Sequence, residues 1–209
     1  MLIIGAGGFA KQLIEVFDQL GLLKEIVLFD DYSDPPEDKL YDLIPILHSD
    51  EEVKKRFATD DRFALGIGDP GKRARLAKRF LALGGKLETI ISPKAYVSKI
   101  NTKIKTGTTV LTSAIVENGV EIGEGVLINI GAFVTHDCRI GDYSEVSPGV
   151  RISGGCSIGS LCFLGTGSVL LPGIKIGDGA KVAAGSVVLE NVPPNVLVAG
   201  VPATIKKTL

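Results

Sequence analysis

An aliphatic residue recurs at every sixth position from Ile104 to Val188 without a break. Small residues such as Ala114, Ala132 and Ser168 often follow four positions later, and glycine, asparagine or serine often comes directly after the aliphatic residue, as a tight corner requires. A fixed short period of this kind is typical of a β-solenoid, in which each rung buries its apolar side on the next. Antiparallel strands of a sandwich would instead alternate with period two between irregular loops. We therefore predict a solenoid with three faces per coil, in which residues about 18 apart stack in columns.

The N-terminal half has a different pattern, in which short apolar runs alternate with charged, helix-like stretches, as in βαβ units that build a parallel sheet. Strands are predicted at residues 2–5, 26–29 and 63–68. Helices are predicted at residues 9–20, at 50–57 after a capping box formed by Ser49 and Glu52, and at 72–83. We predict a mixed architecture, with a Rossmann-like α/β domain at residues 1–91 and a parallel β-helix domain at residues 92–209.

Composition and charge limit the partners that we expect. Of the 209 residues 45% are hydrophobic, which is enough to bury a core, and 23 basic residues nearly balance 24 acidic ones. A formal charge of -1 gives no general attraction to nucleic acid or to an anionic membrane. The chain begins MLIIGAGGFAK, without the basic and apolar regions of a signal peptide, and no stretch approaches the roughly 20 apolar residues of a membrane helix. We expect a cytoplasmic protein with neither a nucleic-acid partner nor a membrane partner.

The cysteines and one histidine have simple structural interpretations. Cys138, Cys156 and Cys162 all occupy the inward small-residue position of the repeat, so we predict that they pack in the core. Their odd number, without a signal sequence, also argues against a disulfide framework. His48 comes just before a predicted helix, and we assign it no role. We expect no metal site.

His136 is the residue whose position suggests chemistry. It follows the inward Val134 by two positions, where the repeat places an outward or corner side chain, and Gly154 and Pro172 occupy the same column one and two coils later. A histidine beside a glycine leaves room for a narrow ligand, and its near-neutral pKa suits a general base that takes a proton from an amine or hydroxyl. Asp137 or Glu145 could orient the imidazole. The residues alone equally allow a surface histidine without a task.

Several runs of the sequence are distinctive: INIGAFVTHDCRIGDYSEVSPGVRISGGCSIG, FLGTGSVLLPGIKIGDGAKVAAGSVV and VAGVPA, with GAGGFAK and FDD near the N-terminus. In these runs the chain resembles the hexapeptide-repeat sugar acetyltransferases, a family that includes the bacillosamine-pathway N-acetyltransferase and sialic acid O-acetyltransferases. The resemblance covers nearly the whole chain. It implies a left-handed β-helix, a homotrimer with the active site at the subunit interface, and direct acetyl transfer from acetyl-CoA without a covalent enzyme intermediate. His136 matches the general base of the family, and Asp137 matches the acidic residue that follows it.

The same resemblance implies two sets of binding residues. For acetyl-CoA, which lies between neighbouring β-helices and is held mainly by backbone groups, these are Gly154, Gly165, Thr166, Ala184, Gly185, Pro202 and Ala203. For the nucleotide-sugar substrate, these are Gly8, Phe9, Lys11, Asp30, Asp31, Gly68 and Asp69. Lys72, Arg75 and Arg79 share one helical face and are candidates for phosphate contacts.

The GAGG turn after the first strand also looks like a dinucleotide fingerprint. However, Ala10 stands where G-x-G-x-x-G requires its third glycine, and a NAD-linked oxidoreductase would leave the repeat half without a purpose. We therefore expect no NAD. Free backbone N–H groups at the start of the following helix still favour a phosphate near this turn.

Two positions depart from the bacillosamine enzyme, which carries histidines where this chain has Phe9 and Glu145. Both border the substrate site in that family, so the sugar or its nucleotide can differ. Our hypothesis is an acetyl-CoA-dependent N-acetyltransferase that acts on a nucleotide-linked amino sugar, a 4-amino-4,6-dideoxyhexose, in bacterial surface glycan synthesis. The alternatives are a sugar O-acetyltransferase of the sialic acid type and a non-catalytic, nucleotide-binding trimeric scaffold.

Overall fold

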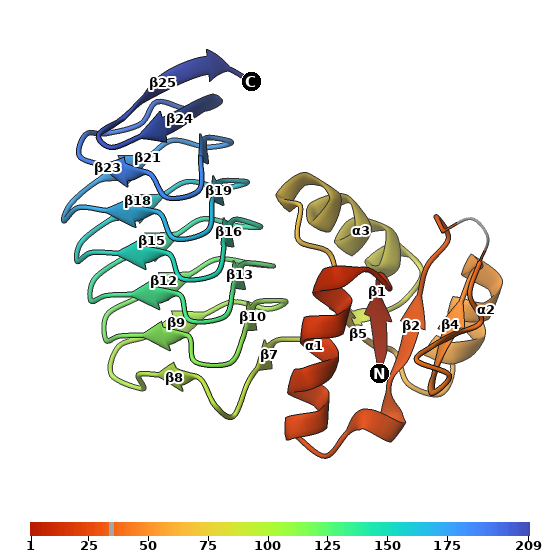
Figure 1. Ribbon diagram of the computed structural model, residues 1–209. Coiled ribbons are helices and arrows are strands. Elements are labelled where there is room, and N and C mark those ends of the chain that lie inside the picture. Colours follow the sequence, from red (N-terminus) through yellow and green to blue (C-terminus); the bar gives the residue numbers. More distant parts are fainter. Residues whose placement is uncertain (34–35) are drawn as a thin grey trace.

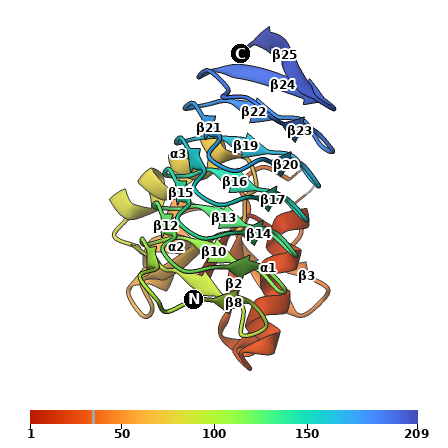
Figure 2. The same cartoon turned by 90° about the vertical axis from the view of Figure 1, so that its left-hand side faces the viewer.

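The chain folds into an α/β domain that lies beside the lower coils of a β-solenoid, as Figure 1 shows for the computed structural model. The structure describes residues 1–33 and 36–209. Figure 2 shows the solenoid rungs stacked one above another, with the last two strands at the far end of the stack. Within these two ranges, no helix has both the length and the apolar character needed to span a membrane.

The N-terminal domain is built on a six-stranded sheet with the strand order β3-β4-β2-β1-β5-β6. Its strands are β1 (Leu2–Ile4), β2 (Val27–Phe29), β3 (Lys39–Leu40), β4 (Ile44–Leu47), β5 (Arg62–Leu65) and β6 (Lys86–Leu87). All neighbours pair in parallel except β3 and β4, which form an antiparallel edge. Strand β1 is buried along its whole length, as expected for a central strand of a parallel sheet covered on both faces.

The helices of this domain are α1 (Gly8–Gln19), the short 3-10 helix η1 (Leu23–Glu25), α2 (Asp50–Phe57) and α3 (Pro70–Ala82). Helix α1 buries Leu13, Val16 and Phe17, whereas Leu20 lies just beyond the last helical residue and is 42% exposed. Gly21 has a φ of +72°, which suits the glycine that commonly follows a helix end.

The N-termini of the three helices differ in how they are capped. The predicted capping box of α2 is present, because the Ser49 hydroxyl accepts from the Glu52 N–H and the Glu52 carboxylate accepts from the Ser49 N–H. Helix α3 begins two residues earlier than predicted, since Asp69 Oδ1 accepts the Lys72 N–H at 2.7 Å. Helix α1 follows Gly7 and has no capping side chain among the described residues. Its first N–H groups therefore remain available to a ligand.

The solenoid is a triangular prism of parallel strands. The first face contains β7 (Ile90–Ile91), β10 (Thr109–Val110), β13 (Leu127–Ile128), β16 (Glu145–Val146), β19 (Phe163–Leu164), β22 (Lys181–Val182) and β24 (Val196–Gly200), to which β25 (Ala203–Thr208) adds in antiparallel orientation. The second face contains β8 (Tyr96–Val97), β11 (Ile115–Val116), β14 (Phe133–Val134), β17 (Arg151–Ile152), β20 (Val169–Leu170) and β23 (Val187–Val188). The third face contains β9 (Lys103–Ile104), β12 (Glu121–Ile122), β15 (Arg139–Ile140), β18 (Ser157–Ile158) and β21 (Lys175–Ile176).

The register of these strands confirms the predicted spacing of 18 residues between stacked positions, as in the pairing of Val116 with Val134 and of Val134 with Ile152. From Val110 to Val188 every residue of the aliphatic ladder is at most 3% exposed, so the ladder forms the core. Cys138, Cys156 and Cys162 are exposed by 1% or less, which confirms that they are core residues. Burial raises the pKa of the Cys162 thiol to about 11, so this cysteine stays protonated.

The outward side chains distinguish the three faces. The first face packs against the N-terminal domain, where Leu127 joins the same buried cluster as α1. The third face carries a polar column of Lys103, Glu121, Arg139, Ser157 and Lys175. The second face carries Ile115, Phe133, Arg151, Val169 and Val187, a mainly apolar column that no described element of this chain covers.

A single buried arginine joins the two halves. Arg73 of α3 is 2% exposed, and its Nε donates to the carbonyl of Gly125 at 2.9 Å. Its Nη2 donates to the carbonyls of Tyr143 at 2.7 Å and Ser144 at 3.0 Å, while its Nη1 donates to the carbonyls of Ile67 and Gly68. The guanidinium thus connects the corners before β13 and β16 to the segment that follows β5.

Candidate active site

His136 lies at the corner where β14 of the second face leads to β15 of the third face. Its side chain is 58% exposed, as predicted for a residue outside the ladder. The imidazole Nδ1 is 2.9 Å from Asp137 Oδ2. Because a carboxylate can only accept, Nδ1 carries a proton in this contact, and Nε2 of the neutral ring is left with its lone pair. This tautomer has the free basic nitrogen that a general base needs.

The pair of His136 and Asp137 sits between two glycines of the neighbouring coils. A Cβ on Gly154 would lie 2.6 Å from His136 Cε1 and Nε2, and a Cβ on Gly119 would lie 2.5 Å from Asp137 Oδ1. Both clashes are closer than real side chains allow, so glycine at these positions makes room for the pair. The carboxylate of Glu117 accepts the backbone N–H of His136 at 3.1 Å and holds the corner from the coil below.

A cavity of about 680 Å³ opens at the carboxyl ends of the parallel strands, where open α/β sheets bind ligands. The glycine turn after β1 lines it, and so do residues that follow β2 and β4 and one side of α3. Of the residues expected to bind the nucleotide sugar, Lys11, Asp30 and Asp31 line this cavity. His48, to which we had assigned no role, lines it as well, and its Nδ1 lies 2.7 Å from the Asp30 carbonyl oxygen.

The two aspartates at the end of β2 have different partners. Asp30 shapes the next turn, because its Oδ1 accepts the Tyr32 N–H at 3.0 Å and its Oδ2 accepts the Ser33 hydroxyl at 2.5 Å. Asp31 instead pairs through Oδ2 with Arg79 Nη1 at 2.7 Å. The other cations that line the cavity, Lys11, Lys72 and Arg75, form no ion pair within residues 1–33 and 36–209.

The remaining residues expected at the nucleotide sugar lie around the cavity rather than in its wall. Gly8 begins α1, and Phe9 packs partly buried against the cluster of that helix. The Asp69 carboxylate caps α3, as described above, and this bond occupies one of its oxygens. Gly68 follows Ile67 of the cavity wall and faces Glu145, whose Oε2 would lie 3.5 Å from a Cβ at Gly68.

Glu145 is a buried carboxylate on the outward side of β16, 7% exposed. Its Oε1 accepts the Ser147 hydroxyl at 3.1 Å, whereas its Oε2 has no hydrogen-bond partner in the described part of the chain. Arg73 Nη1 is 4.0 Å from Oε2, too far for a hydrogen bond, and donates to carbonyls instead. Burial raises the pKa of Glu145, against the opposing effect of Arg73, and burial lowers the pKa of Arg73 to about 10.

The residues expected to bind acetyl-CoA lie at three places on the solenoid. Gly154 shares the corner of His136, between the second and third faces. The corner between the first and second faces holds Gly165, Thr166, Ala184 and Gly185, and there the Gly185 N–H donates to the Thr166 carbonyl at 2.9 Å. Pro202 and Ala203 belong to the turn and strand of the final hairpin. One chain therefore does not bring this whole set to His136, because the second face separates the two corners.

Sequence reasoning missed Glu117, Gly119 and Arg73. The first two could have been found from the repeat, since they lie about one coil before the pair of His136 and Asp137. Arg73 also left a signal, because it falls on the buried stripe of α3 with Pro70, Ala77 and Phe80. An arginine at such a position indicates a guanidinium that is fully hydrogen-bonded.

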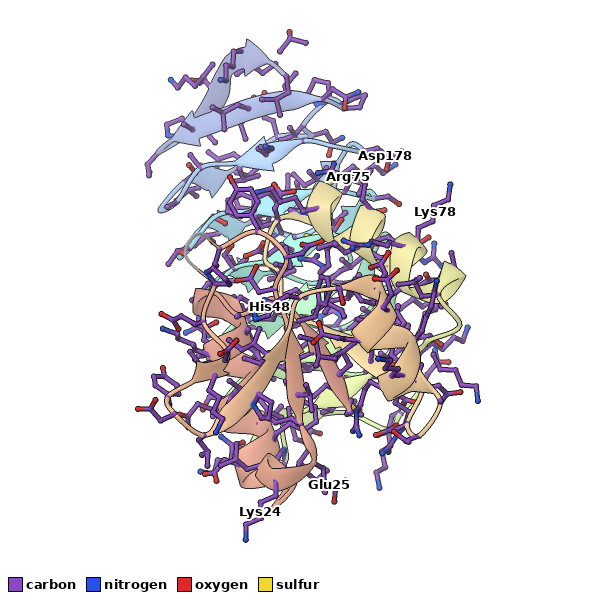
Figure 3. All side chains as sticks on the ribbon, turned by 90° about the vertical axis from the view of Figure 1, so that its right-hand side faces the viewer. Lys24, Glu25, His48, Arg75, Lys78 and Asp178 are labelled. Carbon is purple, nitrogen blue, oxygen red and sulfur yellow. The ribbon has the colours of Figure 1, made fainter. Side chains whose placement is uncertain are left out.

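A second hollow of about 770 Å³ lies near Lys24 and Glu25. Figure 3 shows these two residues at the opposite end of the domain from Arg75 and Lys78 of α3. Within this hollow Asp60 bonds Arg62 at 2.8 Å and Arg56 at 3.3 Å, so these three charges are already paired. Across residues 1–33 and 36–209, there is no group of three or more histidine, cysteine, aspartate or glutamate side chains that could hold a metal ion.

Comparison with known families defines the class. The model of the PglD N-terminal domain matches residues 1–80, and the model of the bacterial transferase hexapeptide (six repeats) matches residues 119–154 and 155–190. A search among curated proteins found no match. An α/β domain of this type joined to hexapeptide repeats defines a hexapeptide-repeat transferase, and the predicted fold class, with its left-handed parallel β-helix, is confirmed.

Solved structures define the family more closely. A mutant of perosamine N-acetyltransferase from Caulobacter crescentus, in complex with CoA and GDP-perosamine, is 34% identical, with a TM-score of 0.91 over 99% of this chain and 96% of that one. The acetyltransferase domain of PglB from Neisseria gonorrhoeae FA1090 is 30% identical, with a TM-score of 0.90 over 98% of each chain. WeeI from Acinetobacter baumannii AYE is 26% identical, with a TM-score of 0.88 over 98% of each chain. The chain belongs to the hexapeptide-repeat sugar acetyltransferase family.

Proposed function

We propose that the protein transfers the acetyl group of acetyl-CoA to the amine of a nucleotide-linked amino sugar. The observation that carries this proposal is the exposed imidazole of His136, with Nδ1 bound to Asp137 and Nε2 beside the glycine at position 154. A neutral, oriented imidazole with one free nitrogen suits a reaction that must remove a proton from an attacking amine. The solved relative with bound CoA and GDP-perosamine supports the same pair of substrates.

The reaction needs one proton acceptor and no covalent enzyme intermediate. The sugar nitrogen attacks the thioester carbonyl carbon while Nε2 of His136 takes a proton from that nitrogen. The carbonyl π electrons move to oxygen, and when they return, the C–S bond breaks and CoA leaves as a thiolate. The imidazolium gives its proton to the thiolate, which restores His136. Asp137 keeps the ring oriented and stabilises the imidazolium during the transfer.

The oxyanion needs a hydrogen-bond donor, and the corner of His136 offers one. The N–H of Gly155 is already bound to the His136 carbonyl at 3.0 Å. The N–H of Gly154 has no partner among the residues that the structure describes. A free amide beside the general base is suited to stabilising the negative oxygen of the tetrahedral intermediate.

The nucleotide and its phosphates fit the cavity of the N-terminal domain. The start of α1 leaves N–H groups free, and a helix N-terminus favours an anion. Lys11, Lys72 and Arg75 line the same space and form no ion pair within residues 1–33 and 36–209. In this arrangement the diphosphate lies by the glycine turn, and the nucleoside lies towards Asp31 and the end of β4.

Glu145 favours an amine over a hydroxyl as the acceptor. Gly68 follows Ile67 of the cavity wall and faces Oε2 of Glu145, which has no hydrogen-bond partner within residues 1–33 and 36–209. A buried carboxylate without a full set of hydrogen bonds attracts the ammonium form of an amino sugar much more strongly than a neutral hydroxyl, and the bound ammonium gives one proton to solvent before the neutral amine attacks. We therefore assign the acceptor as an amino sugar, a 4-amino-4,6-dideoxyhexose by the family resemblance, used in surface polysaccharide synthesis.

Assembly into a homotrimer would complete the site. The apolar column of the second face is open in one chain, and it lies between the corner of His136 and the corner of Thr166 and Ala184. If copies pack through this face around a three-fold axis, one copy contributes its His136 corner and the next its Thr166 corner, with acetyl-CoA between them. Val169→Asp should dissociate the assembly from three times 22.0 kDa to single chains, with loss of activity, whereas Ser157→Asp on the third face should not.

Purified protein with acetyl-CoA and either an amino or a hydroxy nucleotide sugar tests the reaction by release of the CoA thiol. We expect release with the amino sugar, and a fall in kcat of about 10²–10⁴-fold in His136→Asn with acetyl-CoA binding retained. Arg139→Gln, an exposed change on the neighbouring strand, is the matched control and should keep normal turnover.

Turnover with the hydroxy sugar alone would favour an O-acetyltransferase instead. No thiol release with any sugar, together with binding of a nucleotide, would favour a non-catalytic scaffold. Normal turnover in His136→Asn would remove this residue from the mechanism.

A further inference from the structure

Arg79 sits where three segments of the N-terminal domain meet. Its Nη1 bonds Asp31 Oδ2 at 2.7 Å, at the end of β2, and its Nη2 bonds Asp50 Oδ1 at 2.6 Å, in the first turn of α2. Its guanidinium carbon lies 5.2 Å from the ring centre of Phe29 and 5.4 Å from that of Phe80. The residue also lines the cavity of about 680 Å³.

This geometry uses properties that belong to arginine. A planar guanidinium can donate to two carboxylates at once and can lie against aromatic rings, whereas an ammonium group is a single point charge. Lys72 and Arg75, on the same side of α3, have no such partners in residues 1–33 and 36–209. The three cations expected to contact phosphate therefore differ. Lys72 and Arg75 are open to an anion, whereas Arg79 is already bound to two carboxylates.

Asp31 is the group that Arg79 holds towards the cavity. The neighbouring Asp30 uses both carboxylate oxygens within its own turn, so it has little capacity left for a ligand. Among the residues that the structure describes, Asp31 pairs through Oδ2 alone, so Oδ1 has no partner there, and its side chain is 41% exposed. A carboxylate at the end of the second strand of such a domain is well placed to accept hydrogen bonds from the hydroxyl groups of a ribose.

We infer that Arg79 is a positioning residue for nucleotide binding, which fixes the Asp31 carboxylate in the orientation that receives the ribose hydroxyls of the substrate. It acts through Asp31 and touches neither the sugar nor acetyl-CoA. The inference rests on the proposed function, because it requires a nucleotide in this cavity. By bridging Asp31 to Asp50, Arg79 also holds α2 against the strand that carries the ligand contact.

The test compares Arg79→Gln and Arg79→Lys with Lys78→Gln, which removes a neighbouring exposed charge of α3 outside the cavity (Figure 3). UDP and GDP are titrated into each protein by calorimetry, and steady-state kinetics are measured with the amino sugar nucleotide and acetyl-CoA. In Arg79→Gln we expect the KM for the nucleotide sugar and the Kd for the preferred nucleoside diphosphate to rise about three- to tenfold. The kcat and the KM for acetyl-CoA should stay unchanged, Arg79→Lys should lie between wild type and Arg79→Gln, and Lys78→Gln should equal wild type.

A double-mutant cycle with Asp31→Asn shows whether Arg79 acts through Asp31. The two effects on nucleotide affinity should then overlap, so that the double variant is little weaker than Asp31→Asn alone. Additive effects, or an Arg79→Gln variant with unchanged nucleotide affinity, would overturn the inference and leave the proposed function intact. An equal loss for both substrates would show a general structural role instead. If the wild-type protein binds neither nucleotide, the proposed function fails, and the inference fails with it.

Discussion

Replacing Arg73 with methionine should lower the stability of the protein by weakening the interface between the N-terminal domain and the solenoid. The methionine side chain fills much of the same space but donates no hydrogen bonds. Five carbonyl oxygens then lose a donor, three of them on the solenoid, at Gly125, Tyr143 and Ser144. In addition, Glu145 loses the positive charge that lies 4.0 Å from its Oε2. Arg73 is 2% exposed, and Gly125 and Ser144 are buried, so at these two carbonyls water cannot replace the donor without opening the interface.

The expected cost follows from this count. Removing one partner of a buried ionic pair costs about 3–5 kcal/mol, because the other charge stays behind, and each buried carbonyl left without a donor costs about 1–3 kcal/mol more. The Ser144 carbonyl keeps the Leu127 N–H as a donor, and water entry near Ile67 and relaxation elsewhere offset most of the carbonyl cost, so we take the ionic contribution of about 3–5 kcal/mol as the total. For a chain of this length, that is a fall in Tm of about 6–20 °C.

Urea denaturation followed by circular dichroism measures this change, with Lys78→Met as the control, since Lys78 is an exposed residue of the same helix. The control should stay within about 0.5 kcal/mol of wild type. An Arg73→Met protein within about 1 kcal/mol of wild type would refute the reasoning, because the five hydrogen bonds would then contribute nothing net.

Two further predictions concern Gly154 and Glu145. In Gly154→Ala the new methyl group would lie 2.6 Å from the His136 ring, so the imidazole must shift from its place beside Asp137. We expect kcat to fall about 10²-fold with an unchanged circular dichroism spectrum, and Ser153→Ala is the control. For Glu145, burial raises the pKa of the carboxyl in the folded state, so its contribution to stability is fully present below the ordinary pKa and is lost as the pH rises through the folded-state value. The free energy of unfolding of wild type minus that of Glu145→Gln, from urea melts, should therefore increase between pH 7.5 and pH 5; a constant difference would contradict the burial of an ionisable group there.

The solenoid could be predicted because its repeat constrains every coil in the same way. A residue at a ladder position must be aliphatic to fit inside the prism. A corner residue must tolerate a left-handed backbone or a close neighbour. Both requirements recur in every coil and therefore produce a regular pattern in the sequence. That pattern was enough to place the cysteines inside and His136 outside. The boundary between the domains at residue 91 stays a prediction, although β7, which ends there, already pairs with β10 of the solenoid.

The nucleotide end was harder to predict because its important contacts join distant segments. Nothing near Asp31 in the sequence indicates that it pairs with Arg79, which is 48 residues away. The sequence also does not indicate that both carboxylate oxygens of Asp30 accept hydrogen bonds from its own turn. Lys72, Arg75 and Arg79 looked equivalent because helical spacing reports which side of a helix a residue lies on, and not which group it meets there. His48 was set aside for the same reason, since its relation to the cavity depends on the pairing of β4 with β2.

Helix α3 carries both Arg73 and Arg79 and therefore links their contacts. Arg79 holds the carboxylate at the nucleoside end of the cavity, and Arg73 binds the solenoid at the end of the cavity that leads to Glu145. The two arginines are six residues apart on one helix, about 9 Å along its axis. A rigid helix bound at both points fixes the distance between the place where the nucleotide is recognised and the place where the sugar meets the β-helix. Arg73 variants should therefore misplace the sugar and lower kcat, whereas Arg79 variants should weaken nucleotide binding and leave kcat unchanged.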